Sequence, residues 1–292
     1  MMYGIKPPNY RLPESAHIGR VRLQVSDLER SIAYYETVIG FRVLSRDGRV
    51  ARMGAQGDDH VLVELHEKPG VRAVARRGQI GLYHFAILLP DRAALGRFLA
   101  HLTELGVRAG MSDHFVSEAL YLGDPDGLGI EVYADRPRSD WRESDGQLAM
   151  ATNPLDVDSV IAAAHGEPWT GAPPGTTIGH VHLYVRDLDA AAQFYHEGLG
   201  LDKIVWSYPG ALFMSAGGYH HHLGTNTWAA GAPLASDDDA RLLDWEVVVP
   251  TVADADAAAR NIADAGHPVQ RSEQGHVVRD PWGTVLRLVA DR

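Results

Sequence analysis

The chain has 292 residues, of which 45% are apolar and 22% charged, and it is long enough to form two hydrophobic cores. Its formal net charge of -11 argues against a nucleic-acid-binding protein, which needs clustered Lys and Arg to displace counterions from phosphates. The absence of cysteine excludes disulfides, thiolate metal sites and a thiol nucleophile, so any metal must bind through nitrogen and oxygen atoms.

The first residues, MMYGIKPPNYRLPES, contain no apolar core of signal-peptide length. No later run approaches the roughly 18 apolar residues of a membrane span. We therefore expect a soluble, cytoplasmic protein with a small-molecule partner and with neither a nucleic-acid nor a membrane partner. The sequence leaves open whether copies of the chain assemble into a homo-oligomer.

The first predicted module covers residues 17–70. The stretch IGRVRLQV predicts a strand, and SDLERSIAYYETVIGF predicts an amphipathic helix that begins near Asp27 and stops at Gly40. The alternating stretches VARMGA and HVLVELH predict further strands. The order of elements in this module is therefore βαβββ.

Residues 81–137 repeat this layout and complete an N-terminal half, 1–137. GLYHFAILLPDRAALGRFLAHLTELGV predicts a strand and a helix, and EALYLGDPDGLGIEVY predicts two strands around an Asp-Pro-Asp-Gly turn. A polar linker follows at 138–176, with one short helix expected at DVDSVIAAA. The linker is long enough to let the two halves arrange themselves freely.

The C-terminal half, 177–292, contains two more modules, at 177–230 and 241–292. The first of these begins IGHVHLYVRDL, a near copy of IGRVRLQVSDL in the first module. In the second copy His180 and His182 replace two arginines. This exchange suggests that the two copies face different chemical environments.

The four modules resemble the vicinal oxygen chelate superfamily, which includes glyoxalases, bleomycin resistance proteins and extradiol dioxygenases. GLYHFAILLPDR, DHFVSEALYLGDPDGLGIEVYADRPRS and GGYHHHLGTNTW are similar to bacterial catechol 2,3-dioxygenase-like, ring-cleaving proteins. The resemblance covers nearly the whole chain and implies an α+β fold, in which paired βαβββ modules curl into two open mixed-sheet barrels around a metal. Isomerases, lyases, antibiotic-binding proteins and dioxygenases share this scaffold, so the motifs specify the reaction less well than the fold.

In this superfamily the metal ligands lie on the first strand of each paired module and on the last strand of one or both. Internal alignment of the modules fills these slots with Arg20, His84, Glu131, His180, Asp244 and Arg287. Pairing neighbouring modules produces no iron site in either barrel. Pairing the second module with the third gathers His84, Glu131 and His180, the two-histidine, one-carboxylate set that leaves Fe(II) with open positions.

The crossed pairing assigns Arg20, Asp244 and Arg287 to a second barrel. There we expect a structural ion-pair cluster, with a second binding site as the alternative. Glu131 lies in the apolar strand GIEVY, where a carboxylate is costly to bury without a cation. Its position therefore supports a metal in the first barrel.

Ring cleavage also requires a positioned acid-base group. The resemblance places Tyr121 in the cavity and His114 near the substrate, although a structural role in its loop is equally open for His114. In YHHHLGTNTW strand alternation puts His220 and His222 on one face and His221 on the other, and we expect the first two to point into the barrel and His221 to point outward. We therefore expect His220 or His222 to be the acid-base catalyst.

The resulting hypothesis is an Fe(II)-dependent extradiol dioxygenase that adds O2 to catechol or a related diol such as a hydroquinone, in aromatic catabolism or detoxification. Mn(II) is the alternative metal. A second hypothesis is a glyoxalase-like isomerase that uses nickel or zinc with His222 as a fourth ligand. A third, from a different functional class, is a metal-free aromatic- or antibiotic-binding protein.

Overall fold

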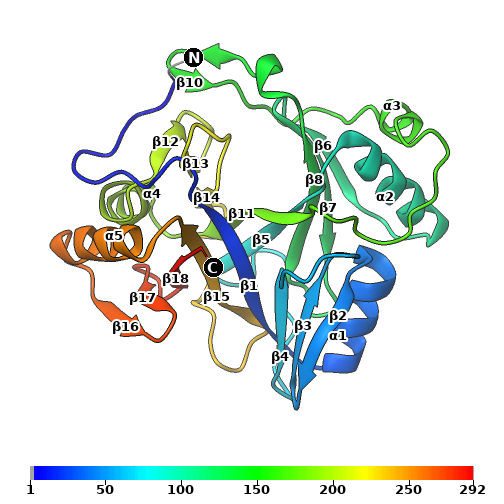
Figure 1. Cartoon of the computed structure of the whole chain (residues 1–292), viewed down its shortest axis with the longest axis horizontal. Helices are drawn as coiled ribbons and strands as arrows, with labels where there is room; N and C mark the ends of the chain where they lie inside the picture. Colours follow the sequence, from blue (N-terminus) through cyan, green and yellow to red (C-terminus); the bar gives the residue numbers. More distant parts are fainter. Residues whose placement is uncertain (1–2, 292) are drawn as a thin grey trace.

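The computed structural model describes residues 3–291, and all four predicted βαβββ modules are present in it (Figure 1). The first module consists of β1 (His17–Val25), α1 (Leu28–Tyr34) continued by the π-helix η1 (Tyr35–Ile39), β2 (Arg42–Asp47), β3 (Val50–Gly54) and β4 (Val63–Glu67). The second consists of β5 (Gly81–Leu88), α2 (Arg92–Glu104), β6 (Gly110–Asp113), β7 (Ser117–Gly123) and β8 (Gly129–Asp135).

The C-terminal half repeats the same order of elements. The third module consists of β11 (Thr177–Tyr184), α4 (Leu188–Ala192) continued by the π-helix η3 (Gln193–Gly198), β12 (Asp202–Val205), β13 (Ala211–Ser215) and β14 (Leu223–Asn226). The fourth consists of β15 (Arg241–Val249), α5 (Val252–Asp264), β16 (Val269–Ser272), β17 (Gly275–Arg279) and β18 (Val285–Ala290).

The modules pair in the crossed manner. One eight-stranded sheet, here called the His sheet, has the order β12-β13-β14-β11-β5-β8-β7-β6 and joins the third module to the second. The other, here called the Arg sheet, has the order β16-β17-β18-β15-β1-β4-β3-β2 and joins the fourth module to the first. In each sheet the two first strands pair antiparallel at the centre, β5 with β11 and β1 with β15. The predicted crossed pairing is therefore confirmed within a single chain.

Carboxylates begin the helices that follow the central strands. Asp27, Asp91 and Asp187 all have extended backbone and accept a hydrogen bond from the amide three residues later. An N-cap of this kind satisfies one of the amides that a helix leaves free at its start. The helix starts predicted near Asp27 and Asp187 are confirmed. Figure 1 shows α1 and α2 on one side of the molecule and α4 and α5 on the other, with the sheets between them.

The segment between the halves is mostly irregular. Its elements are the 3-10 turn η2 (Arg138–Asp140), the short strands β9 (Glu143–Ser144) and β10 (Gln147–Leu148), and α3 (Val157–Ala162). The last of these confirms the short helix predicted there. The main hydrophobic core draws residues from both sheets, and no helix in the described part of the chain is long and apolar enough to cross a membrane.

Candidate metal centre and its cavity

Three side chains converge from three adjacent strands of the His sheet. His84 lies on β5, Glu131 on β8 and His180 on β11. Glu131 Oε2 lies 3.0 Å from His84 Nε2 and 3.2 Å from His180 Nε2, and one potential ligand atom from each residue falls within 4.8 Å of the others. Ala86 on β5 is paired in register with Glu131 on β8 and with His180 on β11. A small side chain therefore lies between these two residues and leaves room for an ion.

The protonation states of this triad suit a divalent cation. Burial raises the pKa of Glu131, but the neighbouring His180 and His84 outweigh it and hold that pKa well below its usual range. Burial also lowers the pKa of His180 to about 4, against the opposing charge of Glu131. An ionised carboxylate beside neutral imidazole is the state in which these groups bind a metal.

The triad also lacks the hydrogen bonds that would satisfy it without a metal. All three residues are at most 4% exposed. Nδ1 of His84 and Nδ1 of His180 have no hydrogen-bond partner among the described residues, and Nε2 of each approaches only Glu131. Buried polar atoms without partners cost free energy, and a bound ion would satisfy those that face the triad. The nitrogen and oxygen donors present therefore fit a non-haem divalent metal.

The symmetry-related position for a fourth ligand is filled by a glycine. In the second module Ala86 pairs with Glu131, and in the third module the corresponding pair is His182 with Gly224. A Cβ atom on Gly224 would lie 2.8 Å from Cγ of His182, so the imidazole occupies the space of a side chain there. The described residues thus provide a triad and leave the remaining coordination positions open.

The histidine run does not have the predicted orientation. Strand β14 begins only at Leu223, so residues 220–222 are not in a strand and the alternation of side chains does not apply. His221 lines the large cavity, with its ring centroid 4.0 Å from that of His180. The prediction that His220 and His222 face the barrel while His221 points outward is therefore wrong.

His222 faces away from the triad. Its Nδ1 accepts a hydrogen bond from the Ala216 amide at 3.1 Å, and its ring lines a separate apolar gap with Trp245 of the Arg sheet. Burial lowers the pKa of His222 to about 3, so the ring is neutral. His222 does not occupy the fourth-ligand position that the isomerase hypothesis gives it.

His220 connects His221 to a carboxylate. His220 Nε2 donates to Asp135 Oδ1 at 2.9 Å, and the Nδ1 atoms of His220 and His221 lie 2.8 Å apart. In the tautomer of His220 that donates from Nε2 alone, Nδ1 carries a lone pair, and His221 Nδ1 is then the donor. This leaves Nε2 of His221 as an unprotonated nitrogen available to the cavity. His220 thus sets the tautomer of His221 without lining the cavity itself.

Tyr121 and His114 line the cavity as predicted and contact each other. His114 Nδ1 donates to the Ala151 carbonyl at 2.6 Å, so its Nε2 accepts from the Tyr121 hydroxyl, also at 2.6 Å. Burial, with the charge of Glu131, raises the pKa of Tyr121 well above its usual value. Tyr121 therefore keeps its proton and directs it toward His114, which leaves its oxygen free to accept.

The cavity above the triad has a volume of about 510 Å³. Its walls are largely aromatic, with Tyr83, Tyr208, Phe213 and Trp228 from β5, the β12–β13 connection, β13 and the loop after β14. Strand alternation alone could have placed His182 in this cavity, because it shares a face with His180. No sequence signal identified the aromatic wall, since its members come from separate segments of two modules.

The equivalent position in the Arg sheet contains charged side chains. Arg287 Nε lies 3.0 Å from Asp244 Oδ1, and Arg20 Nε lies 2.8 Å from Glu246 Oε1. Four further residues join them and complete the cluster, namely Arg22, Arg52, Glu64 and His66. The predicted ion-pair cluster is present, but Arg20 pairs with Glu246 rather than with Asp244. Guanidinium groups here provide the positive charge that a metal would provide in the His sheet.

Comparison with known proteins follows the same division into halves. Residues 17–132 and 177–288 match the family model described as the Glyoxalase/Bleomycin resistance protein/Dioxygenase superfamily. The chain is 47% identical over 272 residues to the catechol-2,3-dioxygenase of Bacillus subtilis (strain 168), and the match covers 92% of this chain and 95% of that protein.

Solved structures with low sequence identity share the fold. A putative dioxygenase from Bacillus subtilis subsp. subtilis str. 168 is 15% identical with a TM-score of 0.64, over 97% of this chain and 86% of that one. Glyoxalase I from Zea mays is 20% identical with a TM-score of 0.57, over 94% of this chain and 92% of that one. At these identities the likeness concerns the fold alone.

Proposed function

Because the chain belongs to the glyoxalase/bleomycin resistance protein/dioxygenase superfamily, we propose that it is an Fe(II)-dependent extradiol dioxygenase acting on a catechol. The 47% identity to a catechol-2,3-dioxygenase supports a dioxygenase over the other reactions of this scaffold. The observation that carries the proposal is the open triad of His84, Glu131 and His180 at the base of an aromatic cavity. Mn(II) is the alternative metal for the same donor set.

Iron bound by the triad would supply adjacent positions for both catechol oxygens and for O2, and a path for electrons between them. The overall reaction breaks the ring bond beside the diol. One oxygen atom of O2 ends in a carboxylate and the other in a carbonyl, and O2 is the oxidant. The protein must accept a phenolic proton from the substrate and later return a proton as the ring opens.

His221 is the proposed base in place of His220 or His222. Its Nε2 is the ring nitrogen available to the cavity, because Nδ1 donates to His220. Burial, with the nearby His180, lowers the pKa of His221 well below its usual value, so the ring is neutral and its free nitrogen carries a lone pair. Asp135 accepts from His220 and so holds the tautomer that keeps Nε2 unprotonated.

Tyr121 and His114 are proposed to orient the diol. The Tyr121 hydroxyl donates to His114, so its oxygen can accept from a substrate hydroxyl. Tyr83 and Trp228 would pack against the aromatic ring and exclude water from it. In this proposal His220 and His222 do not contact the substrate.

The test is anaerobic reconstitution with Fe(II), followed by O2 uptake with a panel of catechols and hydroquinones. We expect O2 consumption equal to the catechol consumed and a yellow ring-opened product. A parallel preparation loaded with nickel or zinc tests isomerase activity on glutathione hemithioacetals. Isomerase turnover without O2 uptake would favour the glyoxalase-like alternative. Catechol binding without turnover by any metal form would favour a binding protein.

A further inference from the structure

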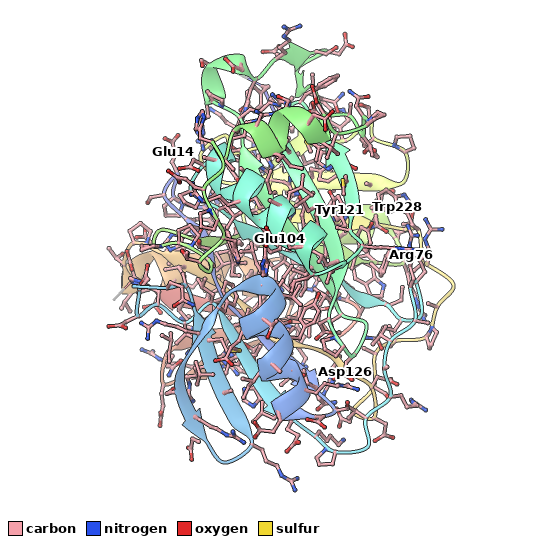
Figure 2. All side chains as sticks on the ribbon, turned by 90° about the vertical axis from the view of Figure 1, so that its right-hand side faces the viewer. Glu14, Arg76, Glu104, Tyr121, Asp126 and Trp228 are labelled. Atoms are coloured by element: carbon pink, nitrogen blue, oxygen red, sulfur yellow. The ribbon has the colours of Figure 1, made fainter. Side chains whose placement is uncertain are left out.

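We propose that Arg76 and Arg77 at the mouth of the cavity recognise an anionic substituent, so that the substrate is a catechol that carries a carboxylate side chain. This inference rests on the proposed dioxygenase function and specifies its substrate class. Both arginines line the same cavity as His84 and Glu131. Figure 2 shows Trp228 and Arg76 at the right of the view and Tyr121 nearer its centre, and all three line the cavity.

A tight turn presents the two arginines together. The Gly78 amide donates to the Ala75 carbonyl at 2.8 Å, so Arg76 and Arg77 are the two central residues of a β-turn. Arg77 has φ 58, a left-handed conformation that non-glycine residues adopt only occasionally. Strained residues of this kind concentrate at ligand-binding sites, because the surrounding structure has to hold them in place.

Contacts on both sides hold this turn in position. The Val74 amide donates to the Asp126 carbonyl at 2.7 Å, and the Ile80 amide donates to the Pro233 carbonyl at 2.8 Å. The loop from β4 to β5 therefore crosses from the Arg sheet to the His sheet with its tip fixed beside the cavity. The backbone that carries the two exposed arginines is thus held at the entrance before any ligand arrives, which reduces the entropy lost by the loop on binding.

Neither guanidinium is neutralised by the protein. Among the described residues no carboxylate oxygen lies within 4.0 Å of Arg76 or Arg77, although the chain has a formal net charge of -11. Both side chains are exposed, and their charges act on the hydroxyls of Tyr83 and Tyr184. Arginine is well suited to binding a carboxylate through two parallel hydrogen bonds. The cavity therefore combines a metal site at its base with unpaired positive charge at its mouth.

The size of the cavity is consistent with a substituted ring. A volume of about 510 Å³ falls within the roughly 300–1,000 Å³ of sites that hold drug-sized ligands, which is more than a bare catechol requires. Tyr83 continues the wall from the triad toward the mouth, since its ring centroid lies 4.5 Å from that of His84 and 5.9 Å from that of Trp228. A diol at the triad would leave an acidic side chain pointing along this wall to the arginines.

The experiment compares 3,4-dihydroxyphenylacetate with its neutral methyl ester and with catechol, using the anaerobically iron-loaded full chain. The variants are Arg76→Gln with Arg77→Gln, and Arg260→Gln as a matched control, because Arg260 is an exposed arginine on α5 outside the cavity. Glutamine keeps a non-glycine residue at φ 58. The measurements are kcat/KM in air and dissociation constants by anaerobic calorimetry, at low and high salt.

We expect the wild type to favour the acid over the ester, and the double variant to lose roughly 10- to 100-fold in kcat/KM and in affinity for the acid alone. Its kcat for catechol should stay unchanged, and high salt should reduce the wild-type preference. Equal use of acid and ester by both proteins, with catechol still cleaved, would overturn the inference and leave the dioxygenase function intact. Acid binding that depends on the arginines, with no diol cleaved, would instead refute the dioxygenase function.

Discussion

His221 and His222 are neighbours in the chain but face different cavities. His221 contacts His180 above the triad, whereas His222 lies in an apolar gap toward Trp245. Gly217 and Gly218 both have left-handed backbone, with φ 61 and 64, and turn the chain just before the run. Because this turn removes the strand geometry, the direction of each ring depends on its own local contacts.

Substitution of this pair should separate catalysis from structure. We expect His221→Gln to lower kcat by roughly 10²–10⁴-fold, the usual contribution of a positioned acid-base group, while iron content stays unchanged. His222→Gln is the matched control, because it changes the adjacent, partly buried histidine, which does not line the cavity. Its kcat should remain within a few fold of the wild type. Stopped-flow assays of iron-loaded protein check both values, and equal losses in the two variants would disprove the assignment of His221.

The proposed iron site can be tested one residue at a time. We expect His84→Ala, Glu131→Ala and His180→Ala each to reduce iron affinity by more than the roughly 10- to 100-fold that the loss of an outer partner causes. Asp244→Asn, in the equivalent position of the Arg sheet, should retain iron and lose stability instead. Metal analysis after gel filtration measures both effects. Iron loss in Asp244→Asn would mean that the metal lies in the other barrel.

At the scale of elements, two equivalent turns, between β7 and β8 and between β17 and β18, pack against the neighbouring module of their own half. Asp280 Oδ1 accepts from the amides of Trp282 and Thr284, and its Oδ2 accepts from Tyr195 in η3 at 3.0 Å. Asp124 accepts the same two backbone hydrogen bonds, because its Oδ1 accepts from the amides of Asp126 and Leu128. Its Oδ2 and the hydroxyl of the corresponding tyrosine, Tyr35, have no hydrogen-bond partner in the described residues. The turn at Asp124 is therefore the less satisfied of the two.

This difference predicts a pH-dependent stability. Burial raises the pKa of Asp124 to about 7, helped by the charge of Asp126, while the backbone amides and Arg30 oppose the rise without cancelling it. The folded state thus binds the proton more tightly than the unfolded state, whose carboxyl titrates near pH 4. The stability that this group contributes is complete below about pH 4 and is lost as the pH rises through about 7.

Asp124→Asn should remove this dependence. The amide oxygen can still accept both backbone hydrogen bonds, and the side chain no longer carries a charge. We expect the free energy of unfolding to fall less between pH 5 and pH 8 in the variant than in the wild type, by on the order of 2–4 kcal/mol. Urea titrations at several pH values measure this, with exposed Asp47→Asn as the control. Parallel pH profiles for Asp124→Asn and wild type would contradict the prediction.

For the whole molecule, crossed pairing means that neither half contains a complete barrel. The N-terminal half supplies β5 and β8 with His84 and Glu131, and the C-terminal half supplies β11 with His180. Each half alone would expose the unpaired edges of β1 and β5 or of β11 and β15, which invite association with other strands. The fold and the proposed metal site therefore depend on both halves together.

Splitting the chain tests this dependence. We expect fragments 1–166 and 167–292, cut in an exposed part of the linker, to assemble into an iron-binding complex when co-expressed. Either fragment expressed alone should aggregate or self-associate and should bind iron weakly, because the triad is divided. Size-exclusion chromatography with metal analysis checks both statements. A monomeric N-terminal fragment with stoichiometric iron would refute the need for His180.

The sequence by itself determined the modules and the triad. The period-2 pattern of each strand and the fixed distance from the helix cap allowed equivalent positions to be aligned, so His84, His180 and Glu131 could be matched to the ligand slots that the resemblance to the superfamily implies. The exchange of arginines for histidines between the two copies then indicated which modules share a barrel. These features are local in the chain, and local periodicity is the property that a sequence shows directly.

The tertiary structure alone decided the cavity above the triad. The direction of His221 depends on two left-handed glycines and on packing against His180. Gly224 became meaningful only when the imidazole of His182 was found in the space of its missing side chain. Arg76 and Arg77 reach the cavity because the loop that bears them crosses between the sheets. Contacts between residues far apart in the chain depend on how the elements pack, and no periodic pattern in the sequence encodes that packing.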